Sequence, residues 1–156
     1  MPSPLPEHCL SRYVIRVRFC ETDLMGIVHH GSYFSYFEAG RVEYMHRRGV
    51  EYLEWAKQGL HLPVIEANAR YRRSARFDER LVVETRLGEH SRVTVRFDYR
   101  ILREGADADD DATEGYTFGA ILPPDGSHGL VAILTRSWNE QALLAEWEST
   151  PTAAPK

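Results

Sequence analysis

The chain has 156 residues, of which 43% are hydrophobic and 27% charged, the composition of an ordinary single globular domain. Its formal net charge of −4 at pH 7 argues against a general nucleic-acid binder, because such a protein needs a basic face. No apolar run approaches the roughly 20 residues of a membrane span, and the N-terminus lacks the pattern of a signal peptide. We therefore expect no membrane association and a cytoplasmic location.

The two cysteines, Cys9 and Cys20, form neither a CxxC pair nor a Cys/His metal spacing. This pattern is typical of reduced thiols in a cytoplasmic protein, so we expect no metal site. The composition along the chain predicts three segments: a flexible lead (1–11), one domain (12–148) and a tail (149–156).

The first half of the domain predicts a strand, a loop and a long helix. Residues 12–19 alternate between apolar and mostly arginine side chains, as a half-buried strand does. Residues 21–28 form a loop, with Gly26 supplying a turn. Residues 32–48 are expected to be helical, with Ser32 as a plausible N-cap.

This helix carries an unusual load of aromatic residues. Tyr33, Phe37, Gly40 and Tyr44 recur at helical spacing, and we expect Phe34, Phe37 and Tyr44 to pack in the core. A glycine inside a helix costs about 1 kcal/mol relative to alanine. Close approach of the helix backbone to a strand or to a second subunit would explain Gly40.

A short second helix is predicted over 50–58, and the chain then consists mainly of strands. The expected strands are 62–72, 81–87, 92–103, 114–122 and 130–136. An acidic loop (105–113) and a short terminal helix (138–147) complete the pattern. An antiparallel sheet wrapped around one long helix, an α+β fold, is the natural layer arrangement. Two copies that pair edge to edge would cover the open edge strands.

The stretch 19–45 carries the strongest chemical signal. Asp23 lies in a loop shortly before the start of the helix, at residues 30–32. The N–H groups at a helix N-terminus attract negative charge. A carboxylate that attacks or activates water, beside donors that hold an oxyanion, suffices for acyl transfer. The residues themselves therefore suggest thioester or ester hydrolysis.

The same stretch resembles the hotdog-fold acyl-CoA thioesterases, in the branch of 4-hydroxybenzoyl-CoA thioesterase and the YbgC-like proteins. The residues that carry the resemblance are Phe19, Thr22, Asp23, Gly26, Val28, His30, Ser32, Tyr33, Glu38, Gly40, Arg41 and Glu43. The resemblance implies a sheet around one central helix, thioester hydrolysis without a cofactor, and a homodimer or homotetramer. Leu24 and Met25 depart from the small residues usual before Gly26, which leaves the acyl group open.

The resemblance implies a catalytic role for Asp23, as nucleophile or as general base, although an aspartate that caps a turn is the alternative. The oxyanion donor is expected to be a backbone N–H near His30 or Gly31. The His30 side chain would orient the carboxylate or the carbonyl, or assist proton transfer. A structural histidine and an ordinary helix-start glycine are the alternatives.

Substrate contacts are expected from five further residues. Tyr33 would line the acyl pocket, or pack in the core. Glu38 would orient water, or form an ion pair with Arg41 three residues on. Arginines near the end of the strand 62–72 would bind the CoA phosphates, or form a solvated strand face. These arginines are Arg70, Arg72 and Arg73, with Arg76 nearby.

The leading interpretation is an acyl-CoA thioesterase that releases a free acid and CoA. A thioesterase acting on acyl carrier protein is the alternative within enzymes. A non-catalytic acyl-binding protein is the alternative from another class, since a fold does not fix a function.

Overall fold

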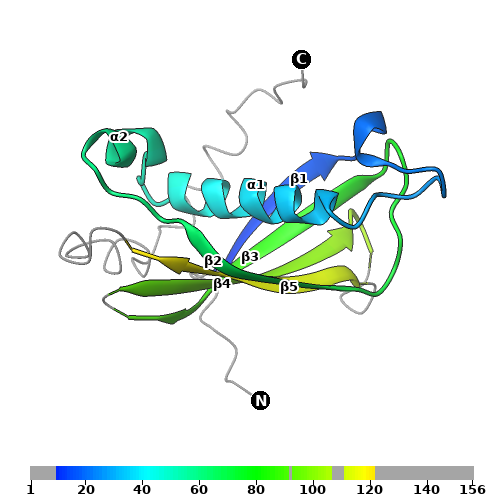
Figure 1. Ribbon diagram of the computed structural model, residues 1–156. Helices are drawn as coiled ribbons and strands as arrows, with labels where there is room; N and C mark the ends of the chain where they lie inside the picture. The colour runs from blue at the N-terminus through cyan, green and yellow to red at the C-terminus, as the bar shows by residue number, and fades with distance from the viewer. Residues whose placement is uncertain (1–9, 92, 107–110, 122–156) are drawn as a thin grey trace.

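The computed structural model describes residues 10–91, 93–106 and 111–121. These residues form five strands and two α-helices, together with a short 3₁₀ turn at Phe19–Glu21. The elements are β1 (Leu10–Arg16), α1 (Ser32–His46), α2 (Tyr52–Lys57), β2 (Val64–Tyr71), β3 (Arg80–His90), β4 (Thr94–Arg103) and β5 (Asp111–Ala120). The strands make one antiparallel sheet of order β1-β3-β4-β5-β2, and α1 lies across it (Figure 1). The predicted architecture is confirmed.

Several predicted boundaries are corrected by strand pairing. Residues 10 and 11, expected in the flexible lead, belong to β1 because they pair with β3. The first strand ends at Arg16, before the 3₁₀ turn that includes Phe19. Strand β5 begins at Asp111, inside the predicted loop 105–113, because its first residues pair with β4. The predicted strand 130–136, helix 138–147 and tail 149–156 lie outside the described residues.

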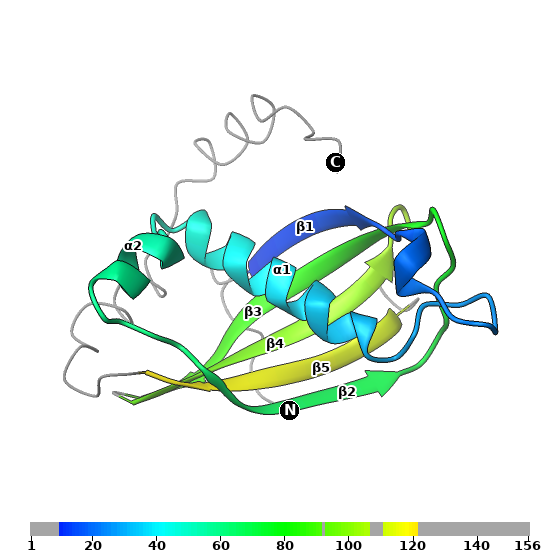
Figure 2. The same cartoon turned by 45° about the horizontal axis from the view of Figure 1, so that its top comes forward.

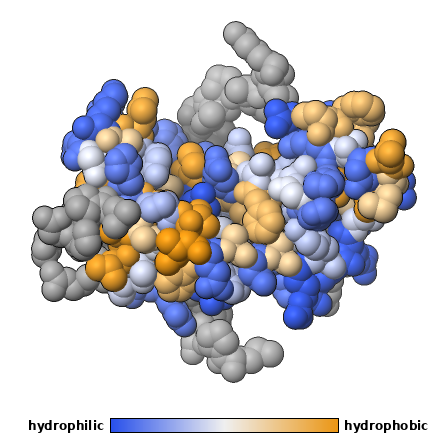
Figure 3. Space-filling model, viewed as in Figure 1, coloured by the Kyte–Doolittle hydropathy of each residue, from blue (hydrophilic) through white to orange (hydrophobic). Residues whose placement is uncertain are grey.

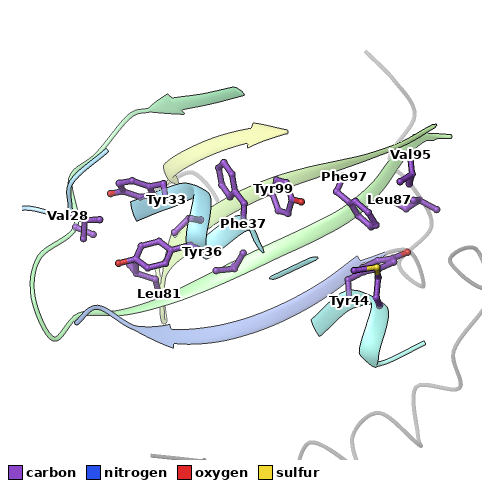
Figure 4. Close-up of a cluster of buried hydrophobic side chains, with 14 of the residues drawn as sticks. Val28, Tyr33, Tyr36, Phe37, Tyr44, Leu81, Leu87, Val95, Phe97 and Tyr99 are labelled. Carbon is purple, nitrogen blue, oxygen red and sulfur yellow. The ribbon is translucent and has the colours of Figure 1, made fainter. Parts of the chain in front are cut away.

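Helix α1 lies across one face of the sheet (Figure 2), and buried side chains of both form the core. As predicted, Phe37 and Tyr44 are buried; Tyr33 is buried as well, which was one of its two alternatives, and the three rings lie between the helix and the strands (Figure 4). The Phe37 ring stacks on Tyr99 of β4 with 4.5 Å between ring centroids. The expectation for Phe34 was wrong: 38% of this residue is exposed. Successive residues of a helix lie about 100° apart around its axis, so Phe34, which follows the buried Tyr33, lies at the edge of the buried stripe.

Gly40 lets the backbone of α1 approach β3 closely. A Cβ atom built on Gly40 would lie 2.5 Å from Thr85 Oγ1 and 2.6 Å from Val83 Cγ1. Real Cβ atoms are not found at such distances, so neither α1 nor β3 has room for a larger residue here. The expected close approach at Gly40 is confirmed, and the neighbour is a strand of the same chain.

Helix α1 ends at His46, and Gly49 follows in the left-handed conformation with φ of +75°. This conformation suits glycine and explains its place after the helix. Helix α2 is shorter than the predicted 50–58. Among the described helices, none is long and apolar enough to cross a membrane.

Replacing Gly40 with alanine has two opposing effects on stability, one from helix propensity and one from packing. Propensity alone would stabilise α1 by about 1 kcal/mol. We expect the opposite sign, a loss of about 1–3 kcal/mol in the free energy of unfolding, because the new methyl overlaps Thr85 and Val83. Urea unfolding measures this loss. The same substitution made in a Val83→Ala background should cost less, and a stabilised Gly40→Ala protein would contradict the close contact.

Candidate active site

Asp23 lies at the base of a tight hairpin that precedes α1. Thr22 and Val28 form an isolated antiparallel bridge at the foot of this hairpin. The Asp23 N–H donates to Ile27 O at 3.0 Å, and the Gly26 N–H donates to Asp23 O at 2.9 Å. Gly26 has φ of +75°, so the turn predicted from this glycine is confirmed. Both backbone groups of Asp23 are therefore held in place.

The Asp23 carboxylate has one engaged oxygen and one that is open. Its Oδ1 accepts a hydrogen bond from the Met25 N–H at 2.8 Å, which is the turn-capping role considered from the sequence. Within the described residues the carboxylate has no ion-pair partner and its Oδ2 accepts no hydrogen bond. The residue is partly exposed. One oxygen is thus available to a water molecule or a substrate carbonyl.

The carbonyl of Glu21 ties the hairpin to the start of α1. It accepts hydrogen bonds from the His29 N–H at 2.8 Å and from Ser32 Oγ at 3.2 Å. The expectation for Ser32 as N-cap was wrong. Gly31 occupies the cap position, and the Ser32 hydroxyl turns back to Glu21 instead of to the helix amides. Asp23 and the helix start are therefore parts of one hydrogen-bonded unit.

The amides at the start of α1 differ in whether they already have an acceptor. The Gly31 N–H donates to His29 Nδ1 at 3.1 Å, and the Ser32 N–H donates to His29 O at 2.9 Å. The His30 N–H has no hydrogen-bond acceptor among the described residues. Of the two amides expected from the sequence, the one on His30 is open and the one on Gly31 is occupied.

Tyr71, at the end of β2, contacts the helix start and was missed by the sequence analysis. Its hydroxyl donates to His30 O at 2.9 Å, and its ring lies 6.3 Å from the His30 ring and 5.2 Å from the Tyr33 ring, between centroids. Partial burial raises the pKa of the Tyr71 phenol, so the hydroxyl remains protonated and can donate at neutral pH. The available signal was an aromatic residue between two arginines in the predicted strand 62–72.

Tyr33 and Glu38 lie on opposite sides of the burial boundary of α1: Tyr33 is buried and Glu38 is exposed. Tyr33 is 2% exposed and belongs to the core, where burial raises the pKa of its phenol. Glu38 is exposed, and its side chain makes no ion pair or hydrogen bond within the described residues. The expected Glu38–Arg41 pair is not formed, because Arg41 Nη1 donates to Tyr99 OH at 3.1 Å and to Thr117 Oγ1 at 3.3 Å.

Arg70 of the predicted arginine cluster lies on the face of the sheet away from α1. Tyr71 faces α1, so Arg70 beside it on β2 faces the opposite side of the sheet, where it pairs in register with Glu114. Arg72 Nη2 contacts Glu114 Oε1 at 2.6 Å. Arg73 is exposed in the segment that follows β2.

Comparison with known proteins identifies the family. Residues 25–108 match the thioesterase superfamily. The chain belongs to this superfamily. Acyl-CoA thioesterase YbgC of Haemophilus influenzae is 31% identical over 94 residues, covering 58% of this chain and 68% of the relative. The predicted YbgC-like branch is therefore confirmed.

Similar solved structures agree with the assignment to the thioesterase superfamily. A hypothetical protein from Thermus thermophilus is 37% identical with a TM-score of 0.71, covering 80% of this chain and 97% of the other. The DHNA-CoA thioesterase of Staphylococcus aureus is 28% identical with a TM-score of 0.71, covering 90% and 97%. The fold is the hotdog fold that the sequence predicted.

Proposed function

We propose that this thioesterase hydrolyses acyl-CoA to a free acid and CoA. The observation that carries the proposal is an open carboxylate oxygen on Asp23 and an open amide on His30, in two segments that Glu21 joins. The YbgC relative supports CoA as the carrier of the acyl group. The cytoplasm is the compartment we propose for the reaction.

In the proposed reaction, Asp23 acts on the carbonyl carbon of the thioester by one of two routes. Its carboxylate either attacks that carbon, releasing the CoA thiolate and giving a mixed anhydride that water then hydrolyses to the free acid, or removes a proton from a water that attacks the carbon, after which the C–S bond breaks and the CoA thiolate leaves. In both routes negative charge develops on the carbonyl oxygen. The His30 N–H donates to this oxygen, and one such donor typically contributes about 3 kcal/mol. The N-terminal end of the α1 dipole favours the same charge.

The His30 side chain and Glu38 have secondary roles in this proposal. The His30 side chain is exposed, so its imidazole can orient the carbonyl or take part in proton transfer. Glu38 is not engaged by Arg41, and we assign its exposed carboxylate to the orientation of water. Tyr33 supports the helix start from the core.

Asparagine at position 23 tests the carboxylate separately from the turn. Its side-chain oxygen still accepts the Met25 N–H, so Asp23→Asn keeps the hydrogen bond that holds the hairpin. Loss of the negative charge should lower kcat by at least about 10²-fold, the usual contribution of a general base. Release of free thiol is measured over short, long and aromatic acyl-CoAs and over acyl carrier protein substrates. A kcat near that of the natural enzyme, in a variant with an unchanged circular dichroism spectrum, would remove Asp23 from the mechanism.

Arg70, Arg72 and Arg73 are proposed to meet the phosphates of CoA, within the same chain or from a second copy. Arginine suits phosphate because its planar guanidinium forms paired hydrogen bonds. The Arg72–Glu114 contact is largely exposed, with relative side-chain exposures of 47% and 38%, so a phosphate can compete for the arginine.

Removing two of these charges should affect substrate binding and leave the chemical step unchanged. We expect Arg72→Ala/Arg73→Ala to raise KM about tenfold, the effect of a few lost charge-assisted hydrogen bonds, with kcat within about twofold. Lys57→Ala removes an exposed charge of α2 and is the matched control. An effect confined to kcat would exclude a role in phosphate binding.

We also propose that two copies pair through β2, as a homodimer or as a homotetramer of two such dimers. Strand β2 is one edge of the sheet, and most of its residues are exposed in the single chain. Val64 is 44% and Ile65 61% exposed, and Figure 3 shows apolar side chains gathered over the start of this strand. An apolar open edge is a ready template for strand pairing.

A charge on this edge should separate the subunits. We expect Ile65→Lys to shift the mass measured by light scattering from a dimer or tetramer to a monomer, because a buried lysine at the seam lacks a partner. Leu53→Lys, at a residue of α2 that is 68% exposed, is the control and should leave the mass unchanged. An Ile65→Lys protein of undiminished mass would place the interface elsewhere.

A further inference from the structure

Side chains hold the peptide group between His30 and Gly31 at both ends. Its carbonyl oxygen accepts a hydrogen bond from the Tyr71 hydroxyl at 2.9 Å. Its N–H donates to His29 Nδ1 at 3.1 Å. The two contacts lie on opposite sides of one planar unit, so together they restrict rotation of that plane.

The neighbouring peptide group, between His29 and His30, is held through its carbonyl. His29 O accepts the Ser32 N–H at 2.9 Å, and the His29 N–H itself donates to Glu21 O at 2.8 Å. The N–H of His30 is the group of this unit that has no hydrogen-bond acceptor among the described residues. The direction of the His30 N–H is therefore set by the 29–30 and 30–31 peptide planes, both of which are held by hydrogen bonds.

The His29 ring fits closely against Gly31. A Cβ atom on Gly31 would lie 3.2 Å from His29 Nδ1 and 3.3 Å from Cε1. The absence of a side chain at position 31 thus gives the imidazole room to reach the Gly31 amide. Because Nδ1 accepts that hydrogen bond, the neutral ring carries its proton on Nε2.

We propose that His29 and Tyr71 are positioning residues that hold the 30–31 peptide and thereby direct the His30 amide toward the substrate carbonyl oxygen. This inference rests on the proposed thioester hydrolysis. Neither side chain needs to touch the reacting atoms, because each acts through the backbone. The arrangement makes the oxyanion site one with a single backbone donor, since His29 occupies the Gly31 amide.

Two substitutions at position 29 separate the acceptor from the ring. Asparagine reproduces the contact, because its side-chain oxygen accepts the N–H two residues on in an Asx turn. Phenylalanine keeps an aromatic ring and removes the acceptor. We expect His29→Phe to lower kcat about tenfold with KM within about twofold, less than the 10²-fold cost of a 1 Å misplacement. His29→Asn should retain most of the kcat.

Tyr71→Phe removes the second contact and should also lower kcat. Because both side chains hold the same peptide, the double variant His29→Phe/Tyr71→Phe should fall by a factor different from the product of the single effects. Tyr52→Phe is the control for loss of a tyrosine hydroxyl. The Tyr52 hydroxyl accepts a hydrogen bond from the Leu62 N–H, in another part of the molecule. Strictly multiplicative effects would show that the two residues act independently and would overturn the proposal.

Nuclear magnetic resonance of the full chain gives a readout that does not depend on activity. An N–H···N hydrogen bond should produce a coupling between the Gly31 nitrogen and His29 Nδ1, and His29→Phe should abolish it. Absence of this coupling in the natural protein, or a higher kcat in His29→Phe, would overturn the inference. If the coupling is present and the natural protein releases no thiol from any acyl-CoA or acyl carrier protein substrate, the proposed hydrolysis fails while this backbone geometry stands.

Discussion

The close approach of α1 to β3 at Gly40 is the constraint on which the rest of the structure depends. With hydrogen in place of a side chain, the helix axis can lie low enough for Phe37 to stack on Tyr99 and for Tyr44 to be fully buried. Gly115 of β5 provides a second space, since a Cβ there would lie 2.9 Å from the Phe37 ring. The height of α1 above the sheet sets where its first amides emerge. Packing far from Asp23 therefore determines the position of the His30 amide, the proposed oxyanion donor.

The site itself is organised by backbone hydrogen bonds rather than by charge pairs. Glu21 O joins the hairpin of Asp23 to the helix start, and Tyr71 joins the helix start to β2. Donors held in this way need no reorganisation when charge develops on a substrate oxygen. Among the described residues of this unit, one oxygen of the Asp23 carboxylate and the His30 amide remain without a hydrogen-bond partner.

Local sequence patterns predicted those features that depend on residues close together in the chain. Alternation and helical spacing gave the sheet and α1, and the motif from Asp23 to Gly31 gave the candidate site. Its turn at Gly26 was also predicted correctly. The errors have local causes. Ser32 turns to a carbonyl eleven positions earlier in the chain, and Phe34 falls one position outside the buried stripe. Neither choice is encoded in helix propensity.

By itself, the sequence determined the α+β class, the family and the pairing of an aspartate with a helix start, because these follow from periodicity and short spacings. Only the tertiary structure decided which groups meet across long separations. It placed Tyr71 on His30 and Arg41 on Tyr99, and it turned Arg70 to the far face of the sheet. These outcomes depend on strand register, where neighbouring residues face opposite sides. Register is fixed by the cooperative packing of the whole sheet against α1.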